Sequence, residues 1–364
     1  MKKLIFATVP ALAVLVLLAS CSDLGYYAQC ARGHLGVINR CRPIPDILAD
    51  PETSPELRDK LKTVQNIREF AVQELDLPDN DSYRSYGDLG RPYVVWNVVA
   101  ANEFSLTPEQ WCFPVAGCVT YRGYFSQQAA ETFADSLRKK DFDVYLYGVE
   151  AYSTLNWFAD PVLSTFLGRS ESSLAGLIFH ELSHQLVYVE NDSRFNEGFA
   201  RAVEMEGVKR WLKKEGDQGD LSRLQAAKER QRKFLELLQE VRRELQNLYD
   251  SETDPQRLRL GKSDILESAF GNYETLKKEW GGFKGYDRFF TGGLNNAKLA
   301  SVSTYQKLVP SFQRLLARFD GKLPQFYREV DRLAELPPDK RLSSLTKGEV
   351  QVADSERRDF GTVE

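Results

Sequence analysis

Residues 174–200 read LAGLIFHELSHQLVYVENDSRFNEGFA, and this stretch carries the strongest signal in the chain. HELSH at 180–184 lies inside a run of apolar residues with helical spacing. Residues four apart on a helix share a face, so His180 and His184 can both reach one cation, with Glu181 beside them. Because the chain has only three histidines, this spacing favours a metal site; the alternative is a structural histidine pair on a buried helix.

The third ligand of such a site is expected to be a carboxylate. The remaining histidine, His34, lies in a glycine-flanked segment and is expected to be a surface residue. A catalytic zinc ion takes three protein ligands, such as two histidines and one glutamate, and keeps one position for water. If one helix ends near 189 and the next begins near 193, His184 and Glu197 meet at one level. Glu197 is therefore the predicted third ligand, with Glu204 as a supporting acid.

Several segments resemble known zinc peptidases. NEGFA at 196–200 resembles the segment of alanyl-aminopeptidase-type gluzincins in which the glutamate is the third zinc ligand, although the spacer from His184 is shorter here. The mature chain resembles the putative bacterial aminopeptidase lipoprotein family, a zincin-like group. The resemblance covers Tyr93 to Tyr305 and rests on HELSHQ, FNEGFA, WCFPVAGCVTYRGYF (111–125), AYSTLNWFADPVLST (151–165) and LNNAKLASVSTY (294–305).

A zincin mechanism follows from these residues. Glu181 is expected to accept a proton from a water molecule activated by one Zn²⁺ per chain, and then to protonate the leaving amine. In related gluzincins a downstream tyrosine or histidine stabilises the oxyanion, and no histidine follows the motif here. Tyr305 is predicted for this role, with Asn295 and Asn296 as partners of the substrate amide. The alternative for these three residues is a core tyrosine and two turn asparagines.

An aminopeptidase also needs an acid that holds the ammonium group of its substrate. The GAMEN segment that does so in related gluzincins is absent from this chain. Glu150, in GVEAY at 148–152, is the candidate substitute. Without a secure amine anchor, endopeptidase activity remains an open alternative.

Residue periodicity predicts an α+β fold that is mainly α-helical. We expect a small N-terminal sheet, a zincin-like metallopeptidase domain and a C-terminal helical part, with a single domain over 53–342 and a flexible tail over 343–364. Strands are predicted at 93–99, 113–125 and 144–149. Helices are predicted at 53–76, 126–139, 172–189, 194–214, 222–250, 263–279, 301–319 and 322–334. The charged segment 222–250 is either a solvated helical hairpin within the domain or a partner-binding arm.

The N-terminus has the pattern of a lipoprotein leader. Lys2 and Lys3 precede an apolar run, and LASC at 18–21 resembles a lipobox. We expect residues 1–20 to be a signal peptide, Cys21 to carry the lipid and 21–52 to form a lipidated N-terminal segment. The protein would then be anchored in the bacterial envelope facing the periplasm, and Ser22 is consistent with the outer membrane. The alternatives are a plain signal peptide and a short membrane anchor.

Four further cysteines remain, which is an even number in an exported chain. Short separations favour the disulfides Cys30–Cys41 and Cys112–Cys118 among the three possible pairings. Four free thiols are the alternative. A zinc site built from these cysteines is disfavoured because the chain has no CxxC pair.

Composition narrows the function classes. The 364 residues are 42% hydrophobic and 27% charged, which is typical of an ordinary globular protein. With 48 Lys plus Arg against 52 Asp plus Glu, no basic excess indicates nucleic-acid binding. The sequence therefore predicts a zinc-dependent metallopeptidase, most simply an aminopeptidase, with peptide substrates and a lipid contact with the membrane. The alternative is a non-catalytic envelope lipoprotein that acts as a binding scaffold.

Overall fold

Two helices at the centre of the fold carry the histidine motif and NEGFA. In the computed structural model, which describes residues 25–113, 117–154, 157–216, 219–303 and 308–346, they are α6 (Glu171–Leu186) and α7 (Ser193–Lys214). The hydroxyl of Ser170 caps α6 and the carboxylate of Asp192 caps α7, each accepting a bond from a first-turn amide. The helices predicted at 172–189 and 194–214 are thus confirmed.

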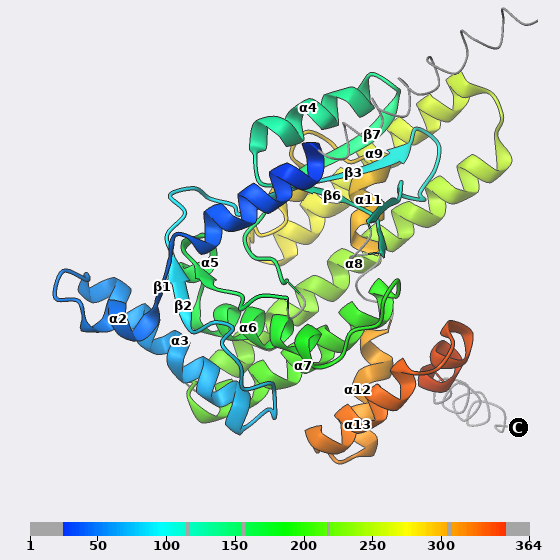
Figure 1. The fold of residues 1–364 in the computed structure, drawn as a ribbon. Helices are drawn as coiled ribbons and strands as arrows, with labels where there is room; N and C mark the ends of the chain where they lie inside the picture. The colour runs from blue at the N-terminus through cyan, green and yellow to red at the C-terminus, as the bar shows by residue number, and fades with distance from the viewer. Residues whose placement is uncertain (1–24, 114–116, 155–156, 217–218, 304–307, 347–364) are drawn as a thin grey trace, which may run out of the picture.

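Both helices bury their apolar faces in the main core. Helix α3 (Pro55–Gln73) packs against α6, and α12 (Val309–Arg318) packs against α7, with α13 (Leu323–Ala334) beyond it (Figure 1). Phe199 of α7 is fully buried against Phe312, Phe326 and Tyr327. Elements packed on both sides therefore hold the α6–α7 hairpin in place.

A three-stranded antiparallel sheet lies above this helical layer in Figure 1. Its order is β6 (Arg122–Tyr124), β3 (Val95–Asn102) and β7 (Phe142–Val149). Helix α4 (Gln127–Arg138) covers one face, and α11 (Asn296–Ser303) contacts β3 and β7 from the other. Because both faces are covered, β3 is buried along nearly its whole length. The predicted small sheet and its helix are confirmed, and the fold is α+β and mainly helical.

The predicted strand at 113–125 is wrong in its continuity. The chain instead forms β4 (Trp111–Phe113) and β5 (Gly117–Val119) before β6, and a Cys112–Cys118 disulfide joins β4 to β5. Gly117 has φ +68°, a left-handed conformation that breaks an extended run. A further sheet, not predicted, contains β1 (Cys41–Pro43), β2 (Ser85–Gly87) and β8 (Val162–Leu163).

Segment 222–250 forms one arm of a long helical hairpin. It lies within α8 (Asp220–Ser251), which packs against α9 (Pro255–Glu279), as Figure 1 shows. Helix α9 starts earlier than the predicted 263 because Asp254 caps it and Pro255 occupies its first turn. Likewise 301–319 is not one helix: it is divided between α11 and α12, and the second begins at Val309 with Pro310 in its first turn. The remaining short helices are α2 (Ile44–Ala49), α5 (Ser164–Leu167) and α10 (Asp287–Phe290).

The N-terminal part of the described chain belongs to the same core. Residues 25–38 form a helix, and Val37, Ile44 and Ile47 are buried in the main hydrophobic cluster. His34, predicted to be a surface residue in a glycine-flanked segment, lies on this helix and is half-buried, with Nδ1 2.7 Å from the Tyr152 hydroxyl. None of the described helices is long and apolar enough to cross a membrane. The predicted signal peptide and lipidated Cys21 lie outside the described residues.

The predicted Cys30–Cys41 disulfide is not formed, and both thiols are free. Cys30 lies in the helix over 25–38, so about 12 Å of helical rise separates it from the helix end before Cys41. A disulfide needs Cα atoms within about 7 Å. The Cys41 thiol instead donates to the carbonyl of Val37. The prediction was wrong because a short separation in sequence brings two cysteines together only in a flexible segment, and the segment after Cys30 is helical.

Candidate metal centre

Three donor side chains converge between α6 and α7. Nε2 of His180 lies 3.2 Å from Nε2 of His184, and 3.3 Å from Oε2 of Glu197. Nε2 of His184 lies 3.6 Å from Oε1 of Glu197. One ligand atom from each residue can therefore be chosen so that all three lie within 4.8 Å of one another. The structure thus brings together the three residues that were predicted as metal ligands.

Local sequence explains why these side chains meet. The histidines are one turn apart on α6, and Glu197 lies in the first turns of α7. The buried amide of Asn196 bridges the connection: its Oδ1 accepts from Val189 N–H and its Nδ2 donates to Val189 C=O, both at 2.8 Å. Asn191 adopts φ +63°, which asparagine tolerates well. This clamp sets the height of Glu197 relative to His184.

The donor spacing fits a zinc ion. A tetrahedral zinc with ligand bonds of about 2.05 Å places its ligand atoms about 3.3 Å apart. The two Nε2 atoms are 3.2 Å apart, which is close to this edge length, and each lies near a different oxygen of Glu197: Oε2 is 3.3 Å from His180 and Oε1 is 3.6 Å from His184. Two imidazoles and one carboxylate also form a donor set that zinc accepts, with a fourth position left for water. The residues present therefore fit the metal.

A second acid supports His180 from outside the cluster. Oε2 of Glu204 lies 3.1 Å from Nδ1 of His180, and Arg201 forms an ion pair with Glu204. A carboxylate at this nitrogen fixes the ring orientation and leaves Nε2 for a metal. By contrast, Nδ1 of His184 is covered and has no hydrogen-bond partner among the described residues.

The electrostatics prepare these groups for different roles. Burial raises the pKa of Glu181 to about 7, with His180 opposing the shift and Glu197 adding to it. Burial, aided by the charge of His180, lowers the pKa of His184 to about 4, so this ring is neutral and ready to ligate. Burial alone would lower the pKa of His180, but hydrogen bonds with Glu197 and Glu204 raise it to about 10. A base with a pKa near neutrality is suited to proton transfer.

A polar network anchors α6 on its other side. Gln185, next to His184, donates from Nε2 to Asp160 Oδ2 at 3.0 Å and to Ser82 Oγ at 3.1 Å. Its Oε1 accepts from Asn80 Nδ2 at 2.8 Å. Buried and satisfied networks of this kind hold an element in one position. The C-terminal half of α6, which carries both histidines, is thereby fixed.

A cavity of about 380 Å³ opens beside the histidine motif. Basic, acidic and apolar side chains line it: Arg169, Ser173, Leu177, His180, Glu181, Arg201 and Glu204. Glu150 is linked to this cavity through Arg169, which lines it. Oε2 of Glu150 lies 2.7 Å from Nη2 of Arg169 and accepts a 2.8 Å hydrogen bond from Nε of the same arginine. The predicted amine-binding acid is therefore already paired with an arginine at the cavity.

The two predicted amide partners have structural contacts. Asn295 donates to the carbonyl of Val144 and accepts from the Lys298 amide at the start of α11. Asn296 is fully buried, and its Nδ2 donates to the carbonyls of Asn102 and Glu103. These bonds tie α11 to the sheet. A role for either residue in substrate binding stays a prediction, and Tyr305 lies outside the described residues.

Some residues near the site could not be assigned to it from the sequence. Tyr121 precedes β6, and its pKa is raised chiefly by burial, with contributions from Tyr147 and then from Glu197 and Glu181. The Cys118 amide donates to Asn191 Oδ1 at 3.1 Å, which holds the preceding β4–β5 hairpin over the α6–α7 turn. Arg169 likewise reaches the cavity from outside the motif helix. These positions depend on tertiary packing.

The fold and the site together define a mainly helical α+β protein with a two-helix His-His-Glu cluster. A protein-family model described as "Putative aminopeptidase" matches residues 25–345. The chain belongs to this aminopeptidase family. Comparison with curated proteins and with solved structures finds no match.

Proposed function

We propose that the protein is a zinc-dependent aminopeptidase with a zincin-like site. The observation that carries the proposal is the convergence of His180, His184 and Glu197 within 4.8 Å, with Glu181 as the neighbouring acid. Within the described part of the chain, neither Glu181 nor Glu197 forms an ion pair with a lysine or arginine. Glu197 instead faces His180, whose pKa is raised to about 10. A divalent cation would replace the proton of His180 and balance both carboxylates.

His180, His184 and Glu197 would hold one Zn²⁺ per chain. When bound there, zinc supplies Lewis-acid polarisation of the scissile carbonyl and of a water molecule. Glu181 accepts the proton of the attacking water and delivers it to the nitrogen of the leaving amine. Its position one residue after His180 places the carboxylate at the cavity and outside the ligand set.

A phenol is proposed to stabilise the oxyanion. Tyr305 is the candidate from sequence. Tyr121 is a second candidate, because the charges of Glu197 and Glu181 contribute to its raised pKa. Replacing each tyrosine with phenylalanine distinguishes the two candidates. The variant that lacks the stabilising phenol should have a kcat lower by about 10²–10³-fold, with its bound zinc unchanged. Unchanged kcat in both variants would reject both assignments.

Recognition of the substrate amine remains with Glu150 in this proposal. Its carboxylate is paired with Arg169 at the cavity, and both side chains are partly exposed. Because the pair is accessible, an incoming ammonium group can compete with Arg169 for the carboxylate. Preference for free over blocked N-termini is the property that this arrangement predicts.

The proposal also includes location. The leader pattern supports a lipid on Cys21 and an anchor in the bacterial envelope, with the peptidase facing the periplasm. Mass spectrometry of the membrane-extracted protein would show a diacylglyceryl adduct on an N-terminal Cys21. An N-terminus elsewhere, or an unmodified Cys21, would refute the anchor.

Metal content and peptide hydrolysis test the function directly. Protein purified without chelators should hold about one zinc per chain and should release the first residue of peptides with free N-termini. Removal of zinc with 1,10-phenanthroline should abolish hydrolysis, and added zinc should restore it. Folded protein that refuses zinc would refute the proposal and favour a binding scaffold. Equal cleavage of peptides with blocked N-termini would show an endopeptidase instead.

Replacing Glu204 with glutamine should weaken zinc affinity by about 10- to 100-fold, because His180 loses its orienting carboxylate and Arg201 loses its partner. Competition with a chromogenic chelator measures the affinity. Glu206→Gln is the matched control, since Glu206 lies on the same helix and pairs with Lys209 and Arg210. Equal affinities in Glu204→Gln and wild-type protein would contradict the supporting role.

A further inference from the structure

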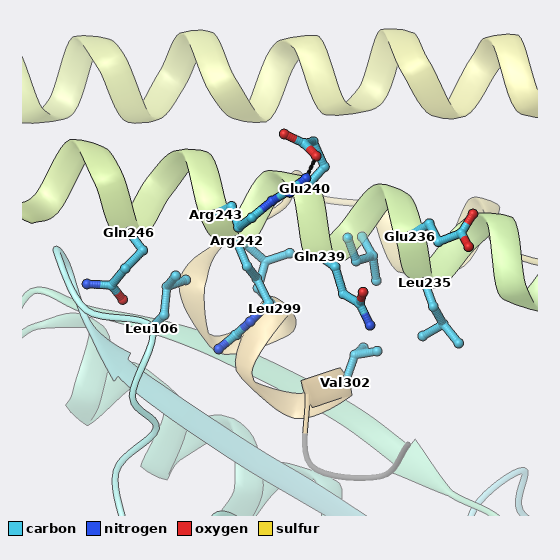
Figure 2. A pocket seen from close by; sticks show the side chains of 11 residues that line it. Leu106, Leu235, Glu236, Gln239, Glu240, Arg242, Arg243, Gln246, Leu299 and Val302 are labelled. Carbon is cyan, nitrogen blue, oxygen red and sulfur yellow. Dashed lines mark ion pairs between the residues drawn. The ribbon is translucent and has the colours of Figure 1, made fainter. Parts of the chain in front are cut away.

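A second cavity, of about 640 Å³, lies between α8 and α11. It shares no lining residue with the cavity at the histidine motif. Leucine, valine, glutamine and charged side chains line it: Leu106, Leu235, Glu236, Leu238, Gln239, Glu240, Arg242, Arg243, Gln246, Leu299 and Val302 (Figure 2). Its volume is within the range of about 300–1,000 Å³ that is typical of small-molecule sites.

The walls of this cavity are largely apolar. Leu106, Leu238 and Leu299 belong to a buried cluster beneath α8, and Val302 of α11 packs against that cluster. Leu235 extends the apolar surface along α8. A hydrocarbon chain that binds here would move out of water and contact an apolar surface that the core already holds in place.

The acids at this cavity already have partners. Glu240 forms an ion pair with Arg243, and Figure 2 shows this pair on the side of α8 away from α11. Glu236 pairs with Arg232, which lies one turn earlier on the same helix. Neither carboxylate therefore needs a ligand for neutralisation.

Arg242 differs from these residues. Its side chain extends from α8 toward α11, on the same side as Gln239 and Gln246 (Figure 2). Its Nη1 is covered and has no hydrogen-bond partner, and its guanidinium forms no ion pair with any residue that the structure describes. Burial lowers the pKa of this guanidinium, with no neighbouring carboxylate to oppose the shift.

Arg242 is half-buried, and its covered Nη1 next to apolar walls is unfavourable without a partner. A guanidinium is also the group that binds carboxylate and phosphate best, through paired N–H donors. Ligand sites typically combine apolar walls with a few convergent polar groups, as here. We propose that this cavity binds a small amphipathic anion, with its carboxylate or phosphate on Arg242 and its unbranched apolar body against Leu235 and Val302, the half-buried apolar residues of the lining.

Calorimetric titration of the purified protein with dodecanoate tests the proposal. Saturable binding of about one dodecanoate per chain is expected. Arg242→Met keeps the length and the apolar stem but removes the charge, so affinity should fall at least about tenfold. Arg257→Met is the matched control and should bind within about twofold of wild type, because Arg257 lies on α9, does not line the cavity and pairs with Glu252.

Three further probes separate the parts of the ligand. Dodecyl phosphate compared with dodecanoate identifies the preferred anionic head, while dodecanol and acetate each lack one half of the ligand and should bind at least about tenfold more weakly. Equal binding of dodecanoate to wild-type and Arg242→Met protein would overturn the proposal, as would failure of both anions to saturate. The melting temperature without ligand should not fall in Arg242→Met, because the change removes an unpaired charge. A marked fall would show a structural role for Arg242 and would also overturn it.

Discussion

Replacing Glu181 with glutamine should lower kcat by about 10²–10⁴-fold and leave zinc bound, because an amide cannot accept the proton of the attacking water. Glutamine has the same shape, and Glu181 is not one of the three clustered donors. Burial has already raised the pKa of this carboxyl to about 7, which suits a base that works near neutral pH. Hydrolysis of an aminoacyl p-nitroanilide gives kcat, and elemental analysis of the same sample gives the zinc content.

The control for this experiment is Glu190→Gln. Glu190 is an exposed acid in the connection between α6 and α7, so it is close to the site in sequence but outside the cluster. Its replacement should leave kcat within about twofold of wild type. Full activity in Glu181→Gln with zinc still bound would eliminate Glu181 as the general base, even if the metal site itself is correct.

Replacing His184 with alanine should reduce zinc from about one per chain to below about 0.1 and abolish hydrolysis, because a buried and neutral donor is removed from a three-ligand set. Loss of a ligand should exceed the effect of losing a supporting carboxylate, which is about 10- to 100-fold in affinity. Zinc is measured after gel filtration, and circular dichroism checks that the helices remain.

His34→Ala is the matched control, since His34 is the only histidine outside the motif. It contacts Tyr152 and Phe158 and is not part of the donor cluster, so this variant should keep its zinc. If His184→Ala retained stoichiometric zinc, the metal would have to bind elsewhere. The proposed centre would then be rejected.

The proximity of the predicted metal ligands could be derived from sequence because it depends on local geometry. Helical rise places His180 and His184 one turn apart, and a short connection between two helices places Glu197 at the height of His184. The contact between Glu204 and His180 could not be derived from local geometry, because Glu204 is 24 residues further along the chain and its position depends on how α7 packs on α6. The sequence predicted Glu204 only as a supporting acid, without naming the histidine that it contacts.

Other features depend on tertiary contacts that one sequence does not reveal. The helix over 25–38 contains Gly33 and Gly36, which disfavour a helix and hid it from the sequence analysis. Without that helix, the short separation of Cys30 and Cys41 led to the wrong disulfide. The pattern over 301–319 predicts one helix, yet α12 begins separately at Val309 with Pro310 in its first turn. Among the described residues Arg242 has no partner, and this depends on the folded surroundings, since acids follow it closely in the chain.

The Asn196 clamp has a consequence for how metal would exchange. Its two bonds to Val189, with the Gln185 network behind α6, order the donors during folding rather than during binding. Ordering entropy is then not lost when the ion arrives, so affinity reflects coordination and the release of the His180 proton. The apoprotein should be a preorganised chelator that unfolds as cooperatively as the holoprotein. Metal supply in the compartment, rather than refolding, would then control how much of the protein is active.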